Sequence, residues 1–164
     1  MPASYLAADH DRIEAFFVQA IENINAIDMD AYQQFRSGLM RHIGIEEKIV
    51  FPKLIEHLGE EAKQMAVRLR SDHGAIVALL VPTPDVEVIA TLNAILSAHN
   101  DYEEGANGVY SMLAVLDEQT TQAMLLQMQQ APEVPTHPTK PTMDVIEITK
   151  RAVARAGYAW VEKN

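Results

Sequence analysis

The sequence predicts an all-α protein: an up-down-up-down antiparallel four-helix bundle, with one extra C-terminal helix after a Pro-rich linker. Apolar residues recur at helical spacing along most of the chain, and no stretch alternates with period two for long enough to form a sheet. Glycine is scarce, with 7 residues, and most of the 8 prolines lie in two stretches, 81–84 and 131–141. These stretches divide the chain into long helical segments.

The first two helices are expected at 4–26 and at about 28–57. The first places its apolar residues Leu6, Ile13, Phe17 and Ile24 on one face. The second begins with Asp28 and Asp30, because acidic side chains suit a first helical turn, and Gly59 follows as its stop signal.

Two more long helices complete the predicted bundle. One is expected at about 60–80, before the Pro82 and Pro84 turn, and one at about 85–116. A shorter helical piece at about 118–130 precedes the linker.

The predicted organisation has three parts, divided at the second Pro-rich stretch. Residues 1–130 form the bundle, 131–142 the Pro-rich linker and 143–164 a C-terminal amphipathic helix. The apolar stripe of this helix is Val145, Ile146, Ala152, Val153, Ala156 and Trp160. We expect this last helix to dock either on the bundle or on a second copy of the chain. The second arrangement would give a homodimer.

Composition narrows the functional classes. With 23 acidic and 13 basic residues the formal net charge is -10, and no basic cluster is present, so nucleic acid is not expected as a partner. Zero Cys excludes disulfides, thiolate nucleophiles and Cys-ligated metal sites. No apolar run is long enough to span a membrane, and residues 1–10 do not resemble a signal peptide. We therefore expect a cytoplasmic protein without a membrane partner.

Four of the 6 histidines lie in a pattern that occurs twice. Asp9-His10 and Asp72-His73 are each followed by Ile three residues after the His. His42 and His99 are each followed, four residues later, by a Glu pair that begins at Glu46 and Glu103. Because positions i and i+4 share one face of a helix, each of these His and Glu side chains can point to the same place.

The repeated histidines lie within apolar, core-facing stripes. Buried carboxylates without partners cost several kcal/mol, and neither Lys nor Arg lies on these stripes to balance Glu46 and Glu103. A metal ion would supply the positive charge. A single buried His is more often an ordinary core residue, so the joint pattern on four helices carries this interpretation.

The candidate metal ligands are four imidazoles and two carboxylates: His10, His42, Glu46, His73, His99 and Glu103. They are too many for one tetrahedral zinc and too poor in oxygen for calcium. They suit two transition-metal ions bridged by carboxylates, although iron, zinc and manganese all accept such ligands. No catalytic residue is assigned.

Together these motifs resemble the hemerythrin family, specifically its bacterial HHE cation-binding type. The resemblance covers residues 1 to about 116 and includes Val50-Phe51-Pro52 after the first His/Glu pair. It implies a four-helix bundle with two non-haem iron ions, held by the same six ligands, with Glu46 and Glu103 as bridges. Val77 stands where oxygen-carrying hemerythrins have a further His, which argues against the classical oxygen carriers.

The first functional hypothesis is a non-haem di-iron protein that binds or senses oxygen or nitric oxide. The gas would enter an apolar pocket lined by Ile13, Phe17, Leu39, Ile45 and Ile76. The alternative is a di-iron enzyme of oxygen, peroxide or nitric oxide detoxification, or of iron supply or repair. The absence of Cys argues against the repair branch. A third reading is a purely structural or interaction bundle.

Overall fold

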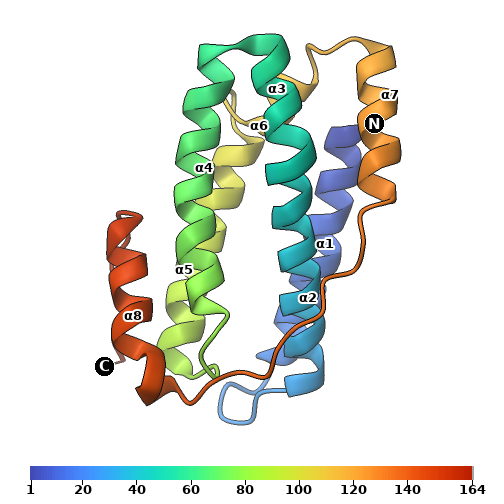
Figure 1. Cartoon of the computed structure of the whole chain (residues 1–164). Coiled ribbons are helices and arrows are strands. Elements are labelled where there is room, and N and C mark those ends of the chain that lie inside the picture. Colours follow the sequence, from blue (N-terminus) through green and yellow to red (C-terminus); the bar gives the residue numbers. More distant parts are fainter. Residues whose placement is uncertain (164) are drawn as a thin grey trace. The chain divides into compact units, whose positions relative to one another are not determined.

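A computed structural model describes residues 1–163, and its helices confirm the all-α class (Figure 1). The part of the chain so described contains no strand, only an isolated bridge between Pro82 and Lys140. The elements are α1 (Pro2–Ala20), α2 (Met29–Ile45), the π-helix η1 (Glu46–Val50), α3 (Phe51–Leu58), α4 (Glu60–Leu79), α5 (Val86–Glu104), α6 (Val109–Leu113), α7 (Glu118–Gln129) and α8 (Thr142–Arg155).

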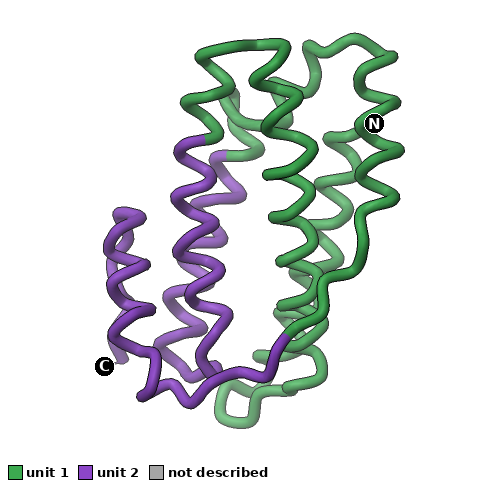
Figure 2. Tube along the Cα trace, viewed as in Figure 1, with its two compact units in different colours: residues 1–66, 103–136 green, residues 67–102, 137–164 purple. Residues whose placement is uncertain are grey.

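The chain divides into two compact units, which Figure 2 draws in different colours. Unit 1 comprises residues 1–66 and 103–136, and unit 2 comprises 67–102 and the described residues from 137 onward. The boundaries of the bundle, linker and C-terminal helix remain predictions. None of the helices within 1–163 has an apolar stretch that would cross a bilayer.

In unit 1, α1 packs against α2 through their apolar faces. Phe17 and Phe35 meet with their ring centroids 4.6 Å apart. Helix α7 packs on α1, and Arg41 of α2 donates to the backbone oxygens of Met128 and Ala131 at 3.1 and 3.0 Å. The end of α7 is thereby attached to the α1–α2 hairpin.

The first helix is shorter than predicted, because it ends at Ala20 rather than near residue 26. Asn23 accepts hydrogen bonds from Asn25 N through its side chain and from Ala26 N through its carbonyl. Such local bonds offer the backbone an alternative to the helix. Ile24, predicted on the buried face, is consequently outside α1 and 36% exposed.

The predicted second helix is interrupted by η1. The backbone N–H of Phe51 donates to the oxygen of Glu46, five residues earlier, which is the wide π pattern. Pro52 gives the physical reason, since it has no N–H and its ring would clash with the carbonyl of Lys48 in a regular helix.

In unit 2, α4 from Val67 onward and α5 up to Tyr102 form a hairpin around the turn at Pro82 and Pro84. Asp85 caps α5, since its side chain accepts from Val88 N at 2.8 Å. The predicted helix at 85–116 instead breaks after Glu104, at the glycine-containing stretch 105–108, before α6 begins.

Helix α8 is shorter than the predicted helix at 143–164. It ends at Arg155, and Gly157 follows with φ 89°, a left-handed conformation that side-chain-bearing residues rarely adopt. The chain then turns back alongside α8 (Figure 1). Trp160, predicted on the apolar stripe of this helix, therefore lies in the segment after it.

Candidate metal centre

Three candidate ligands meet in unit 1: His10 of α1, His42 of α2 and Glu103 at the end of α5. One ligand atom of each lies within 4.8 Å of the others. The two imidazole centroids are 4.3 Å apart, and His10 Nε2 lies 3.2 Å from Glu103 Oε2. Two ligands at right angles, each about 2.1 Å from a transition-metal ion, are separated by about 3 Å. This spacing therefore fits neighbouring ligands of one ion.

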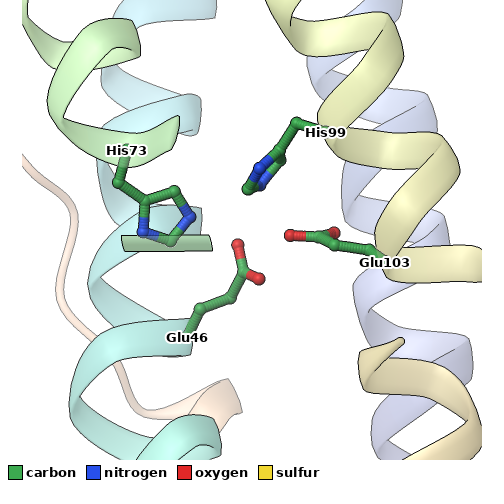
Figure 3. A group of neighbouring side chains, drawn as sticks. All are labelled: Glu46, His73, His99 and Glu103. Carbon is green, nitrogen blue, oxygen red and sulfur yellow. The ribbon is translucent and has the colours of Figure 1, made fainter. Parts of the chain in front are cut away.

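Glu46 adds a second carboxylate to unit 1. It is the first residue of η1, one turn after His42, and its Oε1 lies 3.2 Å from His42 Nε2. The carboxylates of Glu46 and Glu103 point toward one another in Figure 3, with ligand atoms within 4.8 Å. Both side chains are 1% exposed. Burying two neighbouring carboxylates is costly unless a positive charge balances them.

Unit 2 holds the other two candidates, His73 of α4 and His99 of α5. Figure 3 labels both side chains, and their ring centroids are 5.0 Å apart. The two residues are 2% and 3% exposed. This unit therefore contributes a buried pair of imidazoles.

In the α1–α2 hairpin and in the α4–α5 hairpin, one His contacts an aspartate through its Nδ1 atom. Asp9 Oδ2 is 2.8 Å from His42 Nδ1, and Asp72 Oδ2 is 3.0 Å from His99 Nδ1. Because a carboxylate has only acceptor atoms, Nδ1–H is the donor in both contacts. In the neutral imidazole each contact leaves the lone pair at Nε2, which is the form that binds a metal.

The other oxygen of each aspartate also accepts a hydrogen bond. Arg12 Nη2 donates to Asp9 Oδ1 at 2.8 Å, and the Tyr158 hydroxyl donates to Asp72 Oδ1 at 2.9 Å. Burial raises the pKa of Tyr158 to about 12, and the hydrogen bond and charge of Asp72 act in the same direction. The Tyr158 hydroxyl therefore keeps its proton at neutral pH.

Tyr110 of α6 lies behind the remaining imidazole of unit 1, with its hydroxyl 3.0 Å from His10 Nδ1. Burial raises the Tyr110 pKa, and the charges of Glu103 and Glu104 raise it further. The phenol is therefore neutral at physiological pH and is available as a hydrogen-bond partner that orients the His10 ring.

The electrostatic field of unit 1 favours a positive charge at the candidate ligands. Burial alone lowers the pKa of His42, but the charge of Glu46 and the hydrogen bonds of Asp9 and Glu46 outweigh it and raise the pKa to about 10. The same carboxylates would stabilise a bound cation. The donor set and its field thus fit a transition-metal ion.

This shift predicts how the stability of the metal-free protein depends on pH. Because the pKa of His42 is about 10 when folded and near 6.5 when unfolded, its stabilising contribution is complete below pH 6.5 and is lost as pH rises toward 10. Thermal unfolding of chelator-treated protein should show this decline. A His42→Gln chain should show a smaller decline across the same window, and an equal decline would contradict the assignment.

The structure groups the six predicted ligands by unit: four lie in unit 1 and two in unit 2, and their role as ligands remains a prediction. Sequence reasoning did not assign roles to the residues behind the imidazoles, which are Asp9, Asp72, Tyr110 and Tyr158. The repeated Asp-His pair was a signal for the two aspartates. The tyrosines had none, because both follow a break in a helix that was predicted to continue.

Comparison with known proteins gives the chain a family. The model of the Hemerythrin HHE cation binding domain matches residues 1–114. An uncharacterized hemerythrin-like protein of Schizosaccharomyces pombe is 35% identical over 74 residues, which cover 44% of this chain and 36% of that protein. The match thus spans about a third of that relative's length. No solved structure matches. The hemerythrin fold implies a four-helix bundle, and the buried His/Glu clusters indicate a cation site.

Proposed function

Because this chain belongs to the hemerythrin HHE cation-binding domain family, we propose that it is a non-haem di-iron protein that binds or senses oxygen or nitric oxide. The observation that carries the proposal is the pairing of buried imidazoles with buried carboxylates. Ferrous ions held there would supply the electrons that a diatomic gas needs for reversible binding.

The donor set supports two ions. The α1–α2 hairpin supplies two imidazoles, His10 and His42, and the following η1 supplies the carboxylate of Glu46. The α4–α5 hairpin supplies the same set through His73, His99 and Glu103. In this proposal Glu46 and Glu103 would be the carboxylates that the two ions share. Zinc and manganese accept the same ligands, so metal identity is part of the test.

The chain's own residues hold protons and exclude water. Asp9 and Asp72 keep the protons of His42 and His99 on Nδ1, which leaves Nε2 for a metal. The residues proposed to line an apolar gas pocket are each 5% exposed or less: Ile13, Phe17, Leu39, Ile45 and Ile76. Apolar burial limits access of water and protons, which favours reversible binding of a gas over irreversible oxidation.

Gas binding tests the proposal. Iron-loaded protein, kept free of oxygen, is titrated with nitric oxide and separately with oxygen while the visible spectrum is recorded. We expect a saturating spectral change that reverses when the gas is removed. We expect a His73→Gln chain to show a much weaker change, because it loses one imidazole.

The control is His57→Gln, since His57 is exposed on α3 and is not a candidate ligand. It should behave as wild type. Sustained consumption of the gas with a reductant present would overturn the binding function in favour of an enzyme. An iron-loaded protein whose spectrum does not respond to either gas would overturn it altogether.

A further inference from the structure

Asp72 is held from two sides in unit 2. Its Oδ2 accepts from His99 Nδ1 at 3.0 Å, and its Oδ1 accepts from the Tyr158 hydroxyl at 2.9 Å. Asp72 is 4% exposed. With one donor on each oxygen, rotation of this carboxylate would break at least one bond.

The matching aspartate of unit 1 has the same two-sided arrangement with a different donor. Asp9 accepts from His42 and from Arg12, three residues after Asp9 on the same helix. The equivalent position after Asp72 is Ala75, which has no donor in its side chain. Ala75 is also 1% exposed, so a long charged side chain would have no room there. The second Asp-His motif therefore lacks the local donor of the first.

The missing donor comes from Tyr158, which follows α8. We call residues 137–163, which include α8, the C-terminal strap. It is attached at its start, where Thr83 N donates to Lys140 O at 2.7 Å, and beyond α8, where Trp160 Nε1 donates to Glu87 at 2.7 Å. Val161 N also donates to Thr91 Oγ1 at 3.0 Å. Tyr158 lies between these attachments.

We propose that Tyr158, which lies outside the matched domain, is a positioning residue for the candidate metal centre: its hydroxyl fixes Asp72, and Asp72 in turn orients His99. The C-terminal strap thereby provides for the second Asp-His motif what Arg12 provides for the first. This inference rests on the proposed metal function, because it concerns a residue that orients one of the predicted ligands.

In addition to packing on unit 2's helices, the strap helps to orient a metal ligand. A hydrogen bond from a residue behind a metal ligand fixes the tautomer and orientation of that ligand, and its loss typically costs 10–100-fold in metal affinity. Tyr158 acts one step further from the ligand, so a smaller effect is expected. Anything that separates the strap from α4 and α5 would then weaken metal retention.

The test compares Tyr158→Phe with Trp160→Phe. The first change removes only the hydroxyl that reaches Asp72, whereas the second removes a strap attachment to Glu87 and leaves Tyr158 in place. Each chain is loaded with zinc, which is diamagnetic, and zinc release to a chromophoric chelator is timed. We expect Tyr158→Phe to release zinc about 3- to 10-fold faster than wild type, and Trp160→Phe to remain within about 2-fold.

A second readout does not require metal. In histidine-labelled, metal-free protein, nuclear magnetic resonance measures how fast the Nδ1 proton of His99 exchanges with water. We expect faster exchange in Tyr158→Phe but not in Trp160→Phe, at an unchanged melting temperature. A merely structural role for Tyr158 would lower the melting temperature without a selective effect on this proton.

The outcomes separate the two claims. If wild type binds no metal, the proposed function fails, and the exchange of the His99 proton still decides whether Tyr158 positions that ring. If wild type binds metal and Tyr158→Phe changes neither release nor exchange, the positioning role is wrong while the metal function stands. Equal changes in both variants would also overturn it, because docking of the strap rather than the hydroxyl would be responsible.

Discussion

A Glu103→Gln chain is expected to lose metal and yet to be more stable than wild type when both are metal-free. The substitution keeps the size of the side chain and removes one negative charge. Glu103 is 1% exposed and shares its surroundings with Glu46 and with His42, whose pKa is about 10. In the metal-free wild type, the carboxylates of Glu46 and Glu103 thus lie near the protonated imidazole of His42. Glu103→Gln leaves one carboxylate, that of Glu46, with this imidazole.

The expected gain in the free energy of unfolding is about 1 kcal/mol. Two like charges about 5 Å apart repel each other by about 3 kcal/mol at an effective dielectric of about 20. Part of this gain is offset, because the attraction between the Glu103 carboxylate and the His42 imidazolium is lost as well. Metal affinity should fall by on the order of 100-fold or more, because a direct ligand is lost rather than a residue behind one. Denaturant unfolding of chelator-treated protein and metal titration measure the two effects.

Glu104→Gln is the matched control, because Glu104 is the next residue and is exposed. It should change neither quantity by much. If Glu103→Gln instead lost stability and kept its metal, the carboxylate would be a structural partner of His10 rather than a ligand.

Removal of metal from wild type is the second large effect. A ligand that binds only the folded protein stabilises it by RT ln(1 + [L]/Kd), about 4 kcal/mol at a free metal concentration 1,000 times Kd. For a chain of this size 1 kcal/mol shifts the melting temperature by roughly 2–4 °C. We therefore expect the metal-loaded protein to melt roughly 8–16 °C above the chelator-treated protein.

Calorimetry or circular dichroism with and without chelator measures this difference, and metal added back in excess of the chelator should restore it. The Glu103→Gln chain provides the control, since its melting should respond little to metal. Equal melting temperatures for loaded and stripped wild type would mean that the buried His/Glu clusters do not bind the ion in the folded state.

The sequence predicted the helical class and the repeated His/Glu motifs well because both depend on local spacing. Positions i and i+4 share a face in any helix, so His42 with Glu46 and His99 with Glu103 could be paired without knowledge of the tertiary structure. The burial of these carboxylates, 1% exposed each, agrees with their place on apolar stripes.

The helix boundaries differ from those predicted at places where a single residue changes the local backbone. Pro52 widens the helix into η1, Asn23 offers hydrogen bonds that end α1 early, and Gly157 stops α8. Hydrophobic periodicity is insensitive to such events, because the apolar pattern on either side continues nearly unchanged.

The residues that hydrogen-bond to the imidazoles or to their aspartates could not be predicted from the sequence, for a different reason. Tyr110 and Tyr158 reach His10 and Asp72 across 100 and 86 positions of sequence. No spacing rule relates residues so far apart, and only the packing of α6 and of the C-terminal strap brings them there. The contacts that orient a site are therefore harder to predict than the candidate ligands themselves.

The iron content of the purified protein shows whether the buried His and Glu side chains form a di-iron site. The protein is loaded with ferrous iron without oxygen, freed of loosely bound metal, and analysed for iron per chain, with the visible spectrum recorded before and after air. The proposed di-iron site predicts about two irons per chain and a new absorption band after air. A chain that folds normally and retains no iron, or holds a single zinc ion instead, would contradict it.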